Sequence, residues 1–384
     1  MGCRFRRLIA VGFVLLALGW SIPQAAAQAP VRVGVLAPLT GPIAAIAKSE
    51  VNGIRLRLKE LSYEIAGRKV ELIVEDTAAD PATGLTKARK LVERDQVDVL
   101  LGPLTGHVVA AVQDYAGQKG VPQLPLVAQP PENARYRTTL VPSWNNVHIS
   151  RVIGQYAYRK LGYRRAIIMA SSFVSGKRIS DGHREGFTSA GGTIVREIYP
   201  PLGTPDFAPF LAGLPQADAV FAFFPGADGI RYVKQRQELG IQMPLVSVIT
   251  TVEPLILPAQ GEAALGSVAI THYLESLDNP VNRHFLAAYA REYGEPARSY
   301  YPALGYTIVQ ILEEALKRTG GKTAPAEALV AAMRQADFES PQGRFRFDPE
   351  KPFGIMDYYI VKVVKKDGKM GYEVVEVLKE VKPE

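Results

Sequence analysis

Cysteine is almost absent from this chain of 384 residues, which contains Cys3 and no other. A single cysteine excludes a disulfide scaffold and any zinc or iron–sulfur site built from several cysteines. The five histidines, at positions 107, 148, 183, 272 and 284, show neither an HExxH motif nor another paired ligand spacing. We therefore expect neither a metal nor a cofactor in this protein.

Sequence motifs of common enzyme classes are also missing. The chain has no G-x-S-x-G nucleophile elbow and no G-x-G-x-x-G dinucleotide fingerprint. Residues 320–323 read Gly-Gly-Lys-Thr, like the end of a phosphate-binding loop. That loop follows a strand, whereas these residues follow a predicted helix. Paired glycines after a helix are typical of a C-terminal cap. Scattered Ser, His and Asp side chains could still converge in the fold. Because no cluster of them indicates a reaction, we expect no enzymatic activity.

Long apolar runs are confined to the N-terminus. Residues 8–20 form an apolar stretch of about 13 residues, shorter than the ~20 residues that span a bilayer. Arg4, Arg6 and Arg7 precede this stretch, and the small residues 25–27 follow it. The pattern is typical of a secretory signal peptide. We expect residues 1–27 to be removed and the mature protein to be periplasmic, with an uncleaved N-terminal anchor as the alternative.

A strong excess of one charge sign is absent outside this segment. The full chain carries 45 basic and 38 acidic residues, a net charge of +7. Residues 1–27 hold three of the basic residues and no acidic one, which leaves +4 on the remaining chain. Because these charges form no basic block, we expect no nucleic-acid partner.

The chain does contain a regular alternation of short apolar runs and amphipathic stretches. The β-branched run at 31–36 predicts a buried strand, and the apolar spacing over 49–63 predicts a helix. Further strands are predicted at 70–74, 97–101, 165–169, 193–199, 219–224 and 245–249, with a C-terminal hairpin at 355–364 and 372–378. Further helices are predicted at 81–91, 108–119, 148–161, 179–190, 229–239, 279–293 and 306–319. Repeated β-then-α units of about 30 residues predict an α/β fold with two similar lobes, each a parallel sheet flanked by helices.

Three predicted strand-to-helix turns are candidate ligand contacts, at residues 36–42, 100–107 and 126–130. Ligands of parallel α/β folds bind at the carboxyl ends of the strands. Backbone N–H groups at the start of the following helix favour an anion such as a carboxylate. Each turn alone is more typical of an ordinary strand-to-helix connection than of a ligand contact. Three such turns in one half of the chain indicate a binding site.

Short motifs also recur in a characteristic order. They are Leu39-Thr40-Gly41-Pro42, Glu50-Val51-Asn52-Gly53, Glu75-Asp76, Asp80-Pro81-Ala82, Gly102-Pro103, Gly120-Val121-Pro122, Phe207-Ala208-Pro209-Phe210-Leu211 and Ala303-Leu304-Gly305-Tyr306. Over residues 31–378 this series resembles the branched-chain amino-acid (leucine/isoleucine/valine) type of periplasmic binding protein. The resemblance implies two Rossmann-like lobes joined by three hinge crossovers, the type I fold. It also implies delivery of a small molecule to an inner-membrane ABC permease.

The resemblance further implies lobes that are discontinuous in sequence. We expect lobe one at 28–147 plus 275–347, and lobe two at 148–274 plus 348–384. The ligand would bind between the lobes and favour their closure, and we expect the protein to be a monomer. A ligand-sensing regulatory protein of the same fold is the alternative, because it would have no sequence signature of its own.

The resemblance places the carboxylate-binding groups on lobe one. In amino-acid binders of this family, a Ser after the Gly-Pro turn and a Thr after the next strand hold the ligand carboxylate, and the matching positions are Gly106 and Gln129. Gly106 keeps a backbone N–H, and Gln129 keeps a side-chain donor. Thr105 or His107 could supply the missing contact. Further pocket residues expected on this lobe are Ile46, Val127 and Ala128.

The second lobe departs further from the family pattern. The family holds the ligand ammonium with a Tyr after one strand and a Glu after the next, where this chain has Phe223-Phe224-Pro225-Gly226 and Val248-Ile249-Thr250-Thr251. Ile249 falls about where the acid should be, and a buried ammonium without an anion costs several kcal/mol. A shifted alignment could restore the acid through Asp228 or Glu253. We expect Pro225, Gly226, Ile249 and Thr250 to contact the ligand.

These departures favour a carboxylate that has no amine and has a flat apolar body. Trp144 and Phe173 could form the walls of such a pocket, although ordinary core packing is the alternative for both. Residues 223–230 and 357–359 also resemble the aromatic-acid branch of the family. We therefore predict a benzoate- or hydroxycinnamate-like ligand, with a branched-chain or other amino acid as the alternative.

Overall fold

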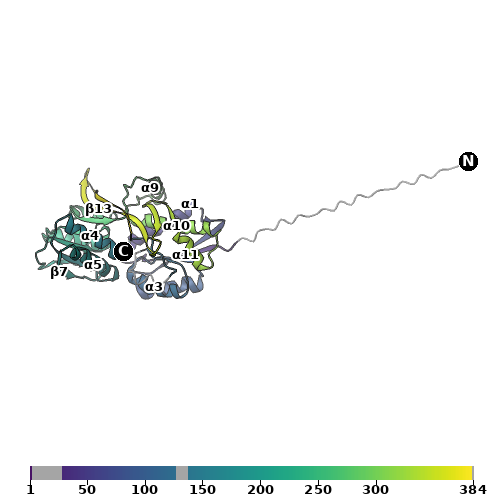
Figure 1. The fold of residues 1–384 in the computed structure, drawn as a ribbon, viewed down its shortest axis with the longest axis horizontal. Helices are drawn as coiled ribbons and strands as arrows, with labels where there is room; N and C mark the ends of the chain where they lie inside the picture. The colour runs from purple at the N-terminus through teal and green to yellow at the C-terminus, as the bar shows by residue number, and fades with distance from the viewer. Residues whose placement is uncertain (2–27, 127–136, 383–384) are drawn as a thin grey trace.

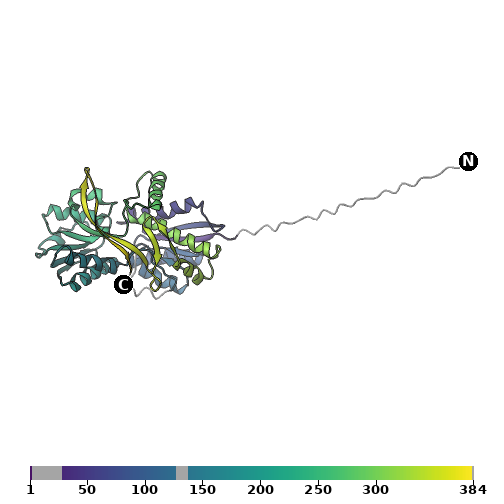
Figure 2. The same cartoon turned by 45° about the horizontal axis from the view of Figure 1, so that its top comes forward.

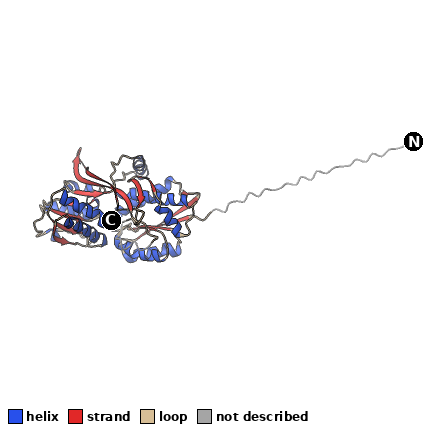
Figure 3. Cartoon of the chain, in the orientation of Figure 1, coloured by secondary structure: helices blue, strands red, loops and turns tan. Residues whose placement is uncertain are grey.

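The computed structural model describes residue 1 and residues 28–126 and 137–382. Two lobes lie side by side, and helices surround the strands of each lobe (Figure 1, Figure 3). The expected signal peptide lies, apart from Met1, outside the described residues. Over the described ranges, no helix is both long enough and apolar enough to cross a membrane.

In the described part of the chain, lobe one is built on a five-stranded sheet with the order β2–β3–β1–β4–β5. Its strands are β1 (Val31–Ala37), β2 (Glu64–Ile65), β3 (Arg68–Asp76), β4 (Val99–Leu101) and β5 (Gln123–Leu124). The central strand β1 pairs in parallel with β3 and β4, so that Val33 lies opposite Leu72 and Val99. Six of the seven β1 residues are buried, which explains why the run is apolar without alternation.

The helices of lobe one come from two distant parts of the chain. They are α1 (Ala44–Glu60), α2 (Pro81–Arg89) with the π-helical turn η1 (Lys90–Arg94), α3 (Gly106–Gln118), α9 (Pro280–Tyr293), α10 (Tyr300–Arg318) and α11 (Ala326–Arg334). Helices α1 and α10 touch where glycine leaves room, because a Cβ on Gly305 would lie 2.2 Å from the backbone oxygen of Glu50. An ion pair of 2.6 Å between Arg57 and Glu313 joins the same two helices.

Over residues 137–382, a nine-stranded sheet extends through lobe two and on to the lobe-one side, with the path β11–β12–β13–β10–β9–β8–β6–β7 and with β14 paired to β13. Its parallel part consists of β6 (Arg165–Ala170), β7 (Thr193–Ile198), β8 (Ala219–Phe223), β9 (Leu245–Val248) and β10 (Val268–Thr271). The helices are α4 (Asn146–Arg159), α5 (Val174–Ser189), α6 (Ala208–Leu211), α7 (Ala227–Glu238) and α8 (Leu257–Gln260), with the 3-10 turns η3 (Ile249–Val252) and η4 (Gly261–Ala264).

Two C-terminal hairpins complete this sheet. The first lies on the lobe-one side, where Gln310 of α10 donates to the Glu339 backbone oxygen at 3.4 Å, and the second lies on lobe two. They are formed by β11 (Asp337–Ser340) with β12 (Gly343–Phe347), and by β13 (Gly354–Lys366) with β14 (Lys369–Val381). Strand β13 pairs antiparallel with β10, so this sheet is mixed. The long β13–β14 hairpin, at the yellow end of the chain, extends from the middle of the molecule along lobe two (Figure 2).

Three segments of the described chain pass between the lobes. They are the stretch before α4 (residues 140–146), the stretch from β10 to α9 (272–279) and the stretch from β12 to β13 (348–353). The first and third are joined, because the Val141 N–H donates to Pro352 at 2.7 Å and the Gly354 N–H donates to Val141 at 3.0 Å. The predicted fold class, two α/β lobes with three crossovers, is confirmed.

The expectation of purely parallel sheets is incomplete. Strand β2 pairs antiparallel with β3, and the two C-terminal hairpins add antiparallel strands to the nine-stranded sheet. Of these elements, only the β13–β14 hairpin was expected. The other elements that the sequence did not predict are the strands β5 and β10, the helices α6, α8 and α11, and the 3-10 turns η3 and η4. Each strand among them has five residues or fewer, which is too short for a hydrophobic period to show in the sequence.

Candidate functional site

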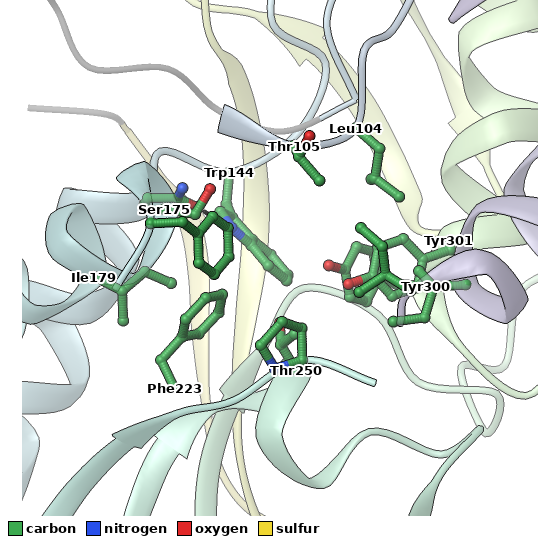
Figure 4. Close-up of a pocket in the computed structure, with 14 residues that line it drawn as sticks. Leu104, Thr105, Trp144, Ser175, Ile179, Phe223, Thr250, Tyr300 and Tyr301 are labelled. Atoms are coloured by element: carbon green, nitrogen blue, oxygen red, sulfur yellow. Dashed lines mark hydrogen bonds between the residues drawn. The ribbon is translucent and has the colours of Figure 1, made fainter. Parts of the chain in front are cut away.

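A cavity lies between the lobes, where the first turns of several helices meet (Figure 4). It contains about 460 Å³ of unoccupied space, part of which is open to solvent. The cavity is lined by Ile43, Ile46, Leu104, Thr105, Trp144, Asn146, Phe173, Ser175, Ile179, Phe223, Pro225, Thr250, Tyr300 and Tyr301.

Lobe one contributes the beginnings of three helices to the lining. These positions are Ile43 and Ile46 of α1, Leu104 and Thr105 directly before α3, and Tyr300 and Tyr301 of α10. Helices α1 and α3 follow the carboxyl ends of β1 and β4, which are neighbours in the sheet. Helix α10 also begins at the cavity. The Ser299 hydroxyl caps its first turn by accepting the Tyr301 N–H at 3.3 Å.

Lobe two contributes lining residues from the carboxyl ends of the strands in its own sheet. Its lining residues are Phe173, Ser175 and Ile179 at the start of α5, Phe223 and Pro225 at the end of β8, and Thr250 in η3. Trp144 and Asn146 are added by the first crossing segment and the start of α4. The Trp144 Nε1–H donates to Asn146 Oδ1 at 2.9 Å, which holds the indole ring against the cavity.

Aromatic rings form much of the cavity wall. The ring centroid of Trp144 lies 4.6 Å from that of Tyr300, which in turn lies 3.9 Å from that of Tyr301. On the side of lobe two, Phe173 and Phe223 are 5.9 Å apart. The hydroxyl groups of Tyr300 and Tyr301 point toward the interior of the cavity (Figure 4). This arrangement suits a flat apolar ligand with a polar substituent.

One part of the cavity suits an anion. Helix α3 begins at Gly106, directly after Thr105, and the first N–H groups of a helix have no acceptor within that helix. Thr105 is 4% exposed, and its hydroxyl oxygen has no hydrogen-bond partner among the described residues. Because a helix N-terminus carries a partial positive charge, a carboxylate here would be stabilised.

Among the described residues, no Lys, Arg, Asp or Glu lines the cavity. Glu50 and Glu253 are fully buried close to Tyr301, and their carboxyl oxygens have no hydrogen-bond partner in the described part of the chain. Burial raises the pKa of Glu253 to about 8 and raises the pKa of Glu50 well above its usual value. Burial therefore favours the neutral form of both carboxyls, whereas a bound ammonium group needs an anion.

Asp228, the other acid considered for this role, is engaged within lobe two. Its Oδ2 accepts the Gly203 N–H at 2.8 Å, and its Oδ1 forms an ion pair with Arg231. Its side chain does not line the cavity. A shifted alignment therefore does not place Asp228 at the ligand.

The structure brings six of the predicted site residues together around the cavity: Ile46, Thr105, Trp144, Phe173, Pro225 and Thr250. Gly106, His107, Gly226 and Ile249 lie within two residues of lining residues in sequence but do not line the cavity. Val127, Ala128 and Gln129 lie outside the described residues. Direct ligand contact by any of these residues stays a prediction.

Two of the predicted residues outside the lining contact the opposite lobe instead. The His107 ring lies edge-on to Phe173, with 5.6 Å between centroids, and its Nε2 lies 2.6 Å from the backbone oxygen of Ala79. Gly226 has a positive φ of 57°, and a Cβ there would lie 2.8 Å from the backbone oxygen of Pro42. These positions therefore allow the lobes to approach each other.

Several lining residues were not predicted from the sequence, and most of them lie at helix starts that fall before the predicted ones. Ser175 and Tyr300 fall in first turns that precede the predicted helices at 179–190 and 306–319. The cap at Ser299 was the available signal for the true start of α10. The other missed residues are Ile43, Leu104, Asn146, Ile179, Phe223 and Tyr301.

Similar proteins are known by sequence and by structure. A "Leu/Ile/Val-binding protein homolog 6" from Brucella melitensis is 30% identical over 358 residues, 91% of each chain. An ABC transporter substrate-binding protein from Sphaerobacter thermophilus is 33% identical, with a TM-score of 0.84 over 91% of this chain and 98% of that one. A solute-binding protein of an ABC transporter from Rhodopseudomonas palustris BisB5, solved with 3,4-dihydroxybenzoic acid, is 32% identical, with a TM-score of 0.85 over 92% and 98%.

The model of the periplasmic binding protein family matches residues 30–369, which include both lobes and the lining of the cavity. This range agrees with the resemblance observed over residues 31–378. The chain belongs to the periplasmic binding protein family.

Proposed function

We propose that this protein is the exported solute-binding component of an ABC importer and that it captures an aromatic monocarboxylate in the cavity between its lobes. Hinge closure would move residues 28–147 and 275–347 against residues 148–274 and 348–384. The ligand favours the closed form because it contacts both lobes. An inner-membrane permease would then receive it from the closed protein.

The character of the cavity lining carries this proposal. Aromatic rings form its walls, and no charged side chain of the described residues lines it. A carboxylate can be held by helix N-terminal N–H groups and hydroxyls without a cationic side chain. An amino-acid ligand would also need an acid for its ammonium group, and the nearby acids, Glu50 and Glu253, are buried, which favours their neutral form.

The relative from Rhodopseudomonas palustris supports the same ligand class, since it was solved with a dihydroxybenzoic acid. We propose that the carboxylate lies near Thr105 and that the ring lies between Trp144 and Phe223. Substituents at the far end of the ring would face the hydroxyls of Tyr300 and Tyr301. A ring hydroxyl can both donate and accept a hydrogen bond there.

Branched-chain amino-acid binding is the second candidate. It is favoured by the relative from Brucella melitensis, which is named as a homologue of Leu/Ile/Val-binding proteins. Glu253 follows β9, close to the position where the family places its acid. This candidate requires Glu253 to ionise and to approach the ligand when an amine binds.

Titration of the exported protein with a ligand panel tests the proposal. Trp144 is the only tryptophan outside residues 1–27, so its fluorescence reports directly on the cavity wall. We expect saturable binding of benzoate, 4-hydroxybenzoate or 3,4-dihydroxybenzoate by calorimetry and by fluorescence, and no heat with leucine, isoleucine or valine. Binding of the amino acids alone would overturn the aromatic assignment.

The transport role needs a separate experiment. A strain that lacks this gene should lose uptake of the labelled acid and should keep normal expression of genes for its breakdown. The opposite result would indicate the ligand-sensing alternative.

We also propose export by cleavage after residue 27 and a monomeric state. Mass spectrometry of the periplasmic protein would check the cleavage, and light scattering would check the monomeric state.

A further inference from the structure

Two helix N-termini from opposite lobes meet beside the cavity. Helix α3 of lobe one begins at Gly106, and helix α5 of lobe two begins at Val174. The ring of Phe173, which precedes α5, packs edge-on against the ring of His107 in the first turn of α3. The partial positive charges of the two helices therefore face the same region.

The absence of a side chain at Gly106 is what permits this approach. A Cβ on Gly106 would lie 2.7 Å from the Ser175 hydroxyl oxygen, closer than real Cβ contacts allow. The next nearest atoms, Ser175 N at 3.4 Å and Val174 Cγ1 at 3.5 Å, are at ordinary contact distance. The Ser175 hydroxyl of lobe two thus lies beside the position that a side chain at residue 106 of lobe one would occupy.

Two residues with hydroxyl groups, one from each lobe, line the cavity at this place. Thr105 and Ser175 both line the cavity and are 4% and 5% exposed. The Thr105 hydroxyl has no partner among the described residues, although a buried hydroxyl normally has one. An acceptor placed between the two residues would bond to both hydroxyls and to the N–H groups of both helices.

We propose that Ser175 is the carboxylate donor of lobe two, and that the ligand carboxylate, held by Thr105 and Ser175 together, couples binding to lobe closure. This inference rests on the proposed function, because it requires a carboxylate ligand. Without an anion, closure brings two positive helix ends together, which is unfavourable. With a carboxylate between them, the same contact becomes favourable.

Ligand selectivity follows from this arrangement. An aromatic compound without an acid group can still pack against the apolar walls of the cavity. It has no carboxylate that could accept hydrogen bonds from both helix N-termini. We expect benzamide and phenol to leave the lobes open. A benzoate of the same ring size should close them, with a decrease in the radius of gyration measured by X-ray scattering.

Removing and relocating the hydroxyl tests the proposal. Ser175→Ala should weaken binding of the best acid from the panel about tenfold to hundredfold, the loss of one hydrogen bond to a charged group. Gly106→Ser combined with Ser175→Ala returns a hydroxyl from the other lobe, and it should recover most of the affinity. Gly106→Ala alone should weaken binding, because its Cβ meets the Ser175 hydroxyl.

Ser172→Ala is the matched control, because Ser172 precedes the same helix but is exposed. It should bind like the wild-type protein, and thermal unfolding should confirm that every variant is folded. Unchanged affinity in a folded Ser175→Ala variant would overturn the role of Ser175. If the wild-type protein binds only amino acids, the proposed function fails, and the same variants titrated with that amino acid still decide whether Ser175 holds the carboxylate.

Discussion

The side-chain nitrogen Nε2 of Gln342 lies 3.0 Å from Nε2 of His272, and this contact joins the second crossing segment to the hairpin that leads into the third. His272 follows β10 at the start of the second crossing segment, and Gln342 lies in the turn between β11 and β12, which leads into the third. Because the amide N–H donates, Nε2 of His272 accepts and the ring is neutral. The same ring packs edge-on against Trp144 of the first segment, 4.6 Å between centroids.

Burial of His272 makes stability sensitive to acid. Burial lowers the pKa of His272 to about 3, whereas an unfolded histidine has a pKa near 6.5. The unfolded chain therefore binds a proton that the folded chain does not, and stability falls as the pH decreases from about 6.5 toward 3. The slope is at most about 1.4 kcal/mol per pH unit for this group.

Urea unfolding of His272→Gln between pH 7 and pH 4.5 checks this prediction. The variant keeps a side-chain acceptor for Gln342 and should lose less stability on acidification than the wild type. If the unfolding free energy of His272→Gln falls with pH as steeply as that of the wild type, His272 is not the source of the acid sensitivity.

Glu253 should act in the opposite direction. Burial raises its pKa to about 8, so the folded chain holds a proton that the unfolded chain releases above pH 4.5. Stability therefore falls as the pH rises from about 4.5 to 8, again by at most about 1.4 kcal/mol per unit. We expect Glu253→Gln to gain stability relative to the wild type as the pH rises over this range, measured by chemical unfolding. Glu373→Gln on the exposed face of β14 should show no such trend.

The contact of α1 with α10 should not tolerate a methyl group. A Cβ on Gly305 would lie 2.2 Å from a backbone oxygen, which a side-chain rotation cannot relieve. We expect Gly305→Ala to lower the free energy of unfolding by about 1–3 kcal/mol or more. Gly371→Ala, where no atom lies within 4 Å of the added Cβ, should be close to neutral. Equal stability of the two variants in urea would show that α1 and α10 can separate without loss.

Phe223 should distinguish aromatic from aliphatic ligands. Its ring lines the cavity and packs with Phe173, and an aromatic pair contributes about 0.5–1.5 kcal/mol beyond its buried area. Phe223→Leu keeps an apolar side chain but removes the ring. We expect about a two- to tenfold loss of affinity for the aromatic acid in calorimetry. An unchanged affinity would mean that the ligand ring does not contact this wall.

Much of the fold follows from local sequence patterns. The apolar runs of β1, β6 and β8 are continuous because both faces of each strand are covered, and this composition is visible without a structure. The helices with a clear apolar face, such as α4 and α9, were predicted within two residues at each end. Short strands such as β10 were not predicted, because four residues are too few to show a hydrophobic period. The position of β10 is determined by its pairing with β9 and β13.

The cavity was predictable only in part. Trp144 was predicted as a wall residue because it lies on a predicted crossover loop, and Phe173 because it follows the strand that ends at Met169. Tyr300 and Tyr301 were not, because they are far from the other lining residues in sequence and reach the cavity only when α10 packs on α1 through Gly305. The role of Gly106 also differs from the expectation, since the residue leaves space for Ser175 of the opposite lobe.

By itself the sequence determined the class of fold, because burial, helix periodicity and turn residues are local requirements that each segment must meet. Its ordered motifs carried the resemblance to the family, which implies that the family's carboxylate and ammonium side chains are replaced at Gly106 and Ile249. Only the tertiary structure decided which atoms face the cavity, how far Glu253 is from water and which groups meet across the lobes. These properties depend on contacts between segments far apart in the chain, and no local pattern encodes such distances.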